Sequence, residues 1–295
     1  MMARGDRALL ATAGVLVVVA LGAVEVRMDD EWGTGVFLAL DLVAAVAVFG
    51  LGLVLADQRP ADERPDGAAT ALLVAGLSLV LSSIINFADV LGAEGGPGSV
   101  TWVALLFAAI AAYPALRRNS PVSGLLSVIA LGVAFVAAVD WIFDPDGIDT
   151  FRWLLLILAI AYGVAAAAGA GGRSHHVVQL VNAAGLAIIL LTASLLTPLI
   201  EDFFGSIFGA GSEPDSFNGP FGWELVTMAG AAGVLAFAVS RRKAGPGYVG
   251  AIALTFAVTV ASIADDEATL VGWPLVLVLL AAGAVAAAVT SSRSA

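Results

Sequence analysis

Long apolar stretches alternate with short polar segments along the whole chain. Each stretch has 17 to 24 residues, close to the ~20 that a helix needs to cross about 30 Å of hydrocarbon. Because a helix satisfies its own backbone hydrogen bonds in lipid, helices are the expected spanning elements. The sequence therefore predicts an all-α, polytopic transmembrane helical bundle, a single integral membrane domain over 1–295 without a soluble domain. The ten predicted spans are 8–26, 36–56, 68–90, 100–116, 122–143, 153–170, 177–200, 223–239, 248–264 and 271–289.

Composition agrees with a membrane protein and excludes several kinds of chemical site. Hydrophobic residues make up 60% of the chain and charged residues 13%, against about 25% charged in soluble domains. The chain has no cysteine, which excludes disulfides and thiolate chemistry. It contains no G-x-S-x-G, H-E-x-x-H or P-loop motif, and we place its two histidines, His175 and His176, in a loop. We therefore expect neither an enzyme nor a cofactor or nucleic-acid partner. Separately, we interpret the first span as an uncleaved helix.

The basic residues are distributed unevenly, although the net charge is −11. If the amino terminus is cytoplasmic, 11 of the 13 lysines and arginines lie inside, and only Arg27 and Arg152 remain in outer loops. Because orientation follows lysine and arginine, we expect a multi-pass plasma-membrane protein with both termini cytoplasmic and acidic loops outside. The inner clusters, expected to anchor the topology and able to bind anionic lipid headgroups, are Arg117–Arg118 and Arg241–Lys243.

Tryptophan and acidic residues recur at regular places in this pattern. A tryptophan lies at or close to the start of each returning helix, and acid ends each outgoing helix. This recurrence favours five tandem two-helix hairpins. The alternative is that tryptophan prefers the interface and that acids collect opposite the basic side. The residues are Trp32, Trp102, Trp153, Trp223 and Trp273, and Glu25, Asp89, Asp140, Glu201–Asp202 and Asp265–Asp266.

Asp41 is the ionisable residue that lies deepest in a predicted span. A carboxylate near the bilayer centre costs ~2.5–3.5 kcal/mol on insertion scales, so it is expected to be protonated, paired or hydrated. We expect a protonated Asp41 that faces Asn86 and Ser83 on the next helix. The resulting candidate site for a solute or cation is Asp41, Ser82, Ser83, Asn86 and Asp89. The alternative is a structural hydrogen bond between two helices.

Two weaker candidates lie elsewhere. Thr255, Thr259, Ser262 and Asp265 share one face of the ninth span and could line a polar path, or could simply join helices at ~0.6 kcal/mol per contact. The fragment Asp144-Pro145-Asp146-Gly147 with Asp149 resembles part of a calcium loop but lacks the distal glutamate. It is equally typical of a β-turn. The weak divalent-ion candidate is Asp144, Asp146 and Asp149.

Two classes of function remain open. In the first, the bundle binds or passes a small solute or cation through an outward acidic mouth. In the second, it is a non-transporting scaffold, sensor or accessory subunit whose helix faces or loops meet a membrane protein partner. Converging polar faces would favour the first class. Interiors packed with alanine and glycine, with polar groups bonded to backbone, would favour the second.

The topology is directly testable with reporter fusions at two sites. Because the basic residues place loop 201–222 outside and the carboxyl terminus inside, fusions at Gly211 and after Ala295 should give opposite readouts. Identical readouts at the two sites would contradict the orientation or the number of spans.

Overall fold

The computed structural model describes residues 4–28, 30–60, 63–93, 95–145, 147–169, 174–196 and 221–263. Within these ranges the chain is helical and has no strand, which confirms the all-α prediction, and nine helices are long and apolar enough to cross a membrane. The tenth predicted span lies outside the described residues. The helices are α1 (Arg4–Met28), α2 (Thr34–Asp57), α3 (Gly67–Val90), α4 (Pro97–Arg118), α5 (Pro121–Phe143), α6 (Ile148–Ala168), α7 (Ser174–Ser194), α9 (Phe221–Arg241) and α10 (Ala244–Ile263).

The described helices begin before the apolar stretches that predicted them, and in α3 and α5 a polar side chain caps the start. Ser120 caps α5 through the Ser123 amide at 3.4 Å, and Pro121 is the first helical residue. Proline suits that position because its missing N–H would have no partner there.

Four boundary predictions are wrong. Helix α7 ends at Ser194, before the predicted end at residue 200. The His175–His176 pair begins α7 instead of lying in a loop. Arg27 lies in the last turn of α1 and Arg152 in the first turns of α6, so neither is a loop residue. Charged residues next to an apolar run can extend a helix, and the hydropathy pattern alone does not reveal this.

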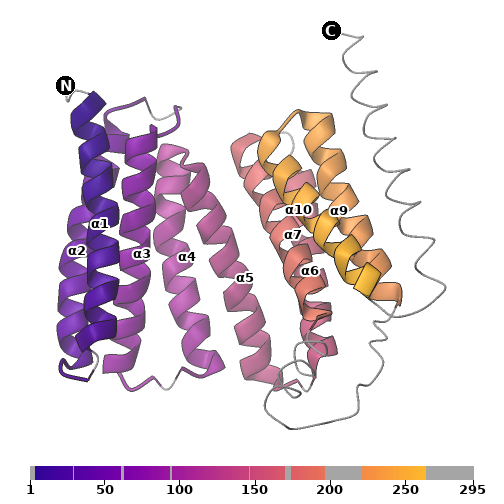
Figure 1. Ribbon diagram of the computed structural model, residues 1–295, viewed down its shortest axis with the longest axis horizontal. Coiled ribbons are helices and arrows are strands. Elements are labelled where there is room, and N and C mark those ends of the chain that lie inside the picture. Colours follow the sequence, from indigo (N-terminus) through magenta and orange to yellow (C-terminus); the bar gives the residue numbers. More distant parts are fainter. Residues whose placement is uncertain are drawn as a thin grey trace. The chain divides into compact units, whose positions relative to one another are not determined.

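The chain divides into two compact units, and α3 is the central helix of the first. This unit holds α1 to α5 and the start of α7, and α3 lies among α1, α2 and α4 (Figure 1). Half of the most apolar stretch of α3 is buried, against 6% of that of α1. Ser83 is buried inside the unit, whereas the side chains of Ser78 and Asp89 are exposed.

Two glycines bring α2 and α3 into close contact. A Cβ atom at Gly76 would lie 2.5 Å from the Cα of Phe49, and one at Gly52 would lie 3.0 Å from the backbone nitrogen of Leu73. Small residues allow such backbone approach, which membrane helices use in place of hydrophobic driving force. The contact also fixes the antiparallel register of the two helices.

The helices of the first unit pack most extensively across the connections that are predicted to be cytoplasmic. Helix α2 packs more on α3 than on α1, and α4 more on α5 than on α3. The Ser127 hydroxyl on α5 donates to the carbonyl of Ala108 on α4 at 2.9 Å. The most closely packed pairs are thus not the hairpins marked by tryptophan and acid. The tandem repeat stays a prediction.

The second unit contains α6, α9, α10 and most of α7. In α7, 61% of the most apolar stretch is buried. Trp153 of α6 and Trp223 of α9 meet edge to face with ring centroids 4.9 Å apart. This ring contact therefore brings the first turns of α6 and α9 together.

Many large apolar side chains point away from the helix contacts. Val26 is 84% exposed, and Leu9 and Val43 are each 71% exposed. Extended apolar surface is uncommon on water-soluble monomers. Apolar surface of this kind suits contact with lipid.

The loop before α3 is tied to α1 through Asp66. Its carboxylate accepts from the Ala69 amide at 2.8 Å, which caps α3, and from Arg7 Nη1 at 2.8 Å. Arg59 Nη2 lies 3.7 Å away. Partial burial acts to raise the pKa of Asp66, but the amide and the two guanidinium groups outweigh it and hold that pKa below its ordinary value.

The glycine contact predicts a specific loss of stability. Gly76→Ala should lower the free energy of unfolding by about 1–3 kcal/mol, because the methyl group would overlap the Phe49 backbone. Gly50→Ala on α2 is the control, since a Cβ there meets no atom within 4 Å. Thermal unfolding in detergent measures both variants. Equal unfolding temperatures would show that the close approach is not required.

Asp66 predicts how stability depends on pH. Because its folded pKa is lowered, its stabilising effect is complete above the ordinary aspartate value and is lost as pH falls through the folded pKa. Asp66→Asn should therefore unfold at a lower temperature than wild type near neutral pH, and the difference should shrink on acidification. The control is Glu63→Gln, which alters an exposed acid of the same loop. A difference that does not depend on pH would contradict this role.

Candidate functional site

Asp41 is almost completely buried, with 2% of its surface exposed. It is the eighth residue of α2, so it lies about 10 Å along the helix at 1.5 Å per residue. Its Oδ2 accepts from the Ser82 hydroxyl and, at 3.2 Å, from Asn86 Nδ2, both on α3. The predicted pairing of Asp41 with Asn86 is therefore present.

The packing of α2 on α3 explains why these residues meet. Phe49 lies against Gly76. Asp41 lies eight residues before Phe49 on α2, and Ile84 lies eight residues after Gly76 on α3. Because the two helices are antiparallel, Asp41 is level with Ile84. Ser82 and Asn86 are two residues to either side of that level, and both reach the carboxyl group.

Glu25 of α1 completes this site, and the sequence did not indicate it as a site residue. Asn86 Nδ2 donates to Glu25 Oε1 at 3.0 Å, and the Ser82 hydroxyl lies 3.4 Å from the same oxygen. We call Glu25, Asp41, Ser82 and Asn86 the carboxyl cluster. The available signal was the acid at the end of the first span, which we interpreted only as interfacial.

Two predicted members lie outside the carboxyl cluster. The Ser83 hydroxyl donates to the Leu79 carbonyl of its own helix at 2.8 Å, so it does not face Asp41 as expected. One helical residue turns the side chain by about 100°, which explains why Ser82 takes that position. Asp89 is exposed, and none of the cluster's hydrogen bonds involves it.

The carboxyl cluster places two acidic groups around one set of donors. Glu25 and Asp41 accept from the same two donors, Ser82 and Asn86, and two like charges at one site are costly unless one of them is neutralised. In the part of the chain that the structure describes, neither carboxyl group forms an ion pair with a lysine or arginine. The arrangement can therefore hold a proton between the acids, or offer carboxyl, hydroxyl and amide oxygens to a hard cation.

The polar stripe predicted on the ninth span lies on an exposed face of α10. Thr255 and Thr259 are exposed, and the Thr259 hydroxyl donates to the Thr255 carbonyl at 2.9 Å. Asp265 and the side chain of Ser262 lie outside the described residues. The Thr259 hydroxyl of this stripe thus bonds to its own helix.

The three carboxylates of the weak divalent-ion candidate are not brought together in the residues that the structure describes. Asp144 ends α5 in the first unit, Asp149 is in the second, and Asp146 lies outside the described residues. Asp149 accepts from Arg152 Nη1 at 2.7 Å. Over the described ranges, no group of three or more histidine, cysteine or acidic residues is placed to hold a metal ion.

Two buried charged residues of the second unit were also not predicted as interior. Arg152 is 6% exposed, and its Nη2 donates to the Ser194 carbonyl at 3.0 Å. Glu224 of α9 is 4% exposed. Both lie near the ends of their helices, where hydropathy patterns cannot distinguish a buried charge from a solvated one.

Comparisons with known proteins give no relative for this chain. No family model, no curated protein and no solved structure matches it.

Proposed function

We propose that the carboxyl cluster binds a proton, or a small monovalent cation that replaces it, and that the protein passes this ion across the membrane. The observation that carries the proposal is the sharing of Ser82 and Asn86 by two carboxyl groups inside the first unit. The basic distribution along the chain supports an outward position for the cluster, with both termini cytoplasmic in the plasma membrane.

Charge is the reason that this cluster favours a cation. Ionised acids in apolar surroundings are costly unless they are paired, and like charges at one site raise that cost. Ser82 has a single hydroxyl proton and cannot donate fully to both Glu25 and Asp41. A proton or a cation between the two acids neutralises one charge and satisfies the remaining acceptor.

The exchange of this ion would form the transport step. When Asp41 and Glu25 share a proton or cation, the cluster carries one negative charge; releasing the ion leaves two. This difference changes how strongly α1, α2 and α3 are held together at the cluster. Such a change in interaction energy between two states is what a coupled movement requires.

A flux assay with three variants tests the proposal. Full-length protein in vesicles with a trapped pH dye should respond to an imposed proton or sodium gradient. Asp41→Asn and Glu25→Gln should reduce the flux to that of protein-free vesicles, because each removes an ionisable group. Asp41→Asn should fold with stability within about 1 kcal/mol of wild type, since the amide keeps an acceptor and a donor.

Asp89→Asn is the matched control for these variants. It removes one carboxylate from the same helix, at an exposed position outside the carboxyl cluster, and should leave the flux unchanged. Unchanged flux in a folded Asp41→Asn variant would overturn the proposal. Absence of any wild-type flux of protons, sodium or potassium would do the same.

A second candidate, a non-transporting scaffold or accessory subunit, is favoured by a different observation. Several buried hydroxyl groups donate to carbonyls three or four residues earlier in their own helix, as a dry, packed interior requires. The bonds join Ser83 to Leu79, Thr192 to Ile188, Ser194 to Leu191 and Thr227 to Glu224. Wild-type vesicles without ion flux would favour this candidate.

A further inference from the structure

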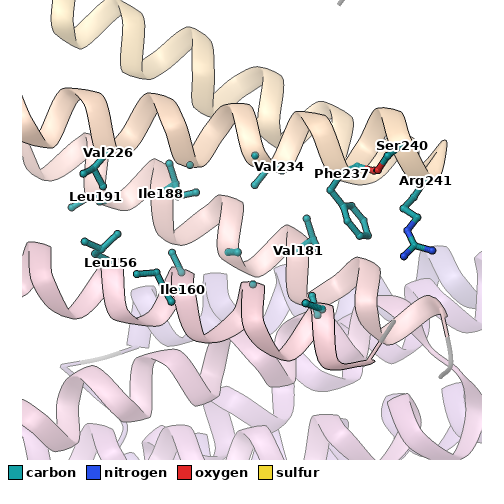
Figure 2. A pocket seen from close by; sticks show the side chains of 17 residues that line it. Leu156, Ile160, Val181, Ile188, Leu191, Val226, Val234, Phe237, Ser240 and Arg241 are labelled. Atoms are coloured by element: carbon teal, nitrogen blue, oxygen red, sulfur yellow. The ribbon is translucent and has the colours of Figure 1, made fainter. Parts of the chain in front are cut away.

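The second unit contains an apolar cavity of about 600 Å³ between α6, α7 and α9. Its size is within the range of small-molecule sites, ~300–1,000 Å³. Figure 2 shows Leu156, Leu191 and Val226 at one end, Ile160, Ile188 and Val234 in the middle, and Ser240 and Arg241 at the other end. The cavity is thus a long apolar space that ends at a positive charge.

Small residues create this space. Gly163 of α6 and Gly233 of α9 both line it, and a Cβ atom at either position would meet no atom within 4 Å. Ile160, Gly163 and Gly233 are also exposed, so the cavity opens on the surface of this unit. Apolar cavities remain free of water and accept apolar molecules, and hydrocarbon is the apolar molecule that surrounds a membrane helix.

Arg241 gives the cavity chemical selectivity. It is the last residue of α9, it is exposed, and Arg242 and Lys243 follow it. Among the residues that the structure describes, no carboxylate forms an ion pair with Arg241. A guanidinium group binds phosphate through two parallel hydrogen bonds, and basic pockets between membrane helices bind anionic headgroups.

We infer that this cavity binds one acyl chain of an anionic phospholipid and that Arg241 pairs with the lipid phosphate. The glycines and alanines of α6 and α9 leave room for the chain, and Leu156, Leu191 and Val226 surround its far end. Arg241, the one basic residue that lines the cavity, favours an anionic headgroup over a zwitterionic one. The site is independent of the carboxyl cluster, which belongs to the other unit.

Native mass spectrometry of the full-length protein in detergent tests this inference with phosphatidylglycerol and phosphatidylcholine of the same chain length. Wild type should bind one phosphatidylglycerol about fivefold more tightly than phosphatidylcholine, the effect of roughly one basic residue at a headgroup. Arg241→Gln should remove this preference. Gly163→Leu and Gly233→Leu should weaken the binding of both lipids, because leucine would fill the space for the chain.

Matched controls separate these effects from general changes in charge or helix stability. Arg117→Gln removes an arginine from the end of α4 in the other unit. Ala165→Leu and Ala236→Leu add leucine at exposed positions of α6 and α9 outside the cavity. All three should retain wild-type preference and affinity, and thermal unfolding verifies that each variant is folded.

Three results would overturn the inference. The first is equal affinity of wild type for the two lipids, which would mean unselective hydrocarbon contact. The second is unchanged phosphatidylglycerol binding in folded Gly163→Leu and Gly233→Leu, which would place the lipid elsewhere. The third is displacement of phosphatidylglycerol by inorganic phosphate at equal concentration, which would show an anion site without an acyl-chain pocket.

Discussion

The close contact between α2 and α3 at Gly52 and Gly76 determines the arrangement of the first unit. Without side chains at these positions the two backbones approach until Phe49 lies against Gly76. That contact sets the register, and the register brings Asp41 to Ser82 and Asn86 on α3. Each consequence depends on the one before it, because replacing one contact residue by its neighbour in the sequence turns the facing side chains by about 100° about the helix axis.

The two units place polar groups in different ways. In the first unit, Glu25, Asp41 and Asn86 from three helices converge on shared hydrogen bonds. In the second, buried hydroxyl groups such as Thr192 bond to their own helix, and the described cavity is apolar up to Arg241. Converging acids suit an ion, whereas an apolar cavity with one cation suits an amphiphile. This difference in chemistry is why we propose separate ligands for the two units.

The preference for packing of α2 on α3 and of α4 on α5, across the connections that are predicted to be cytoplasmic, bears on how the chain is organised. In the predicted topology, tryptophan and acid mark the outer ends of helix pairs, where the interface and the opposite charge bias select them. Close packing is selected by glycine and alanine instead, and these residues join α2 to α3 and α4 to α5. A two-helix unit defined by its outer residues is therefore not the same as a unit defined by its packing.

The sequence by itself determined the class of fold, the described helices to within six residues at either end and the interior position of Asp41. These follow from local properties, namely the length of apolar runs, caps such as Ser120 and the cost of a carboxyl group in lipid. The pairing of Asp41 with Asn86 was also predictable, since antiparallel neighbours place both at one depth. The tertiary structure decided that Ser82 and not Ser83 faces Asp41, and that Glu25 joins from α1. Helix rotation and the choice of neighbours depend on packing between distant segments, which no local pattern encodes.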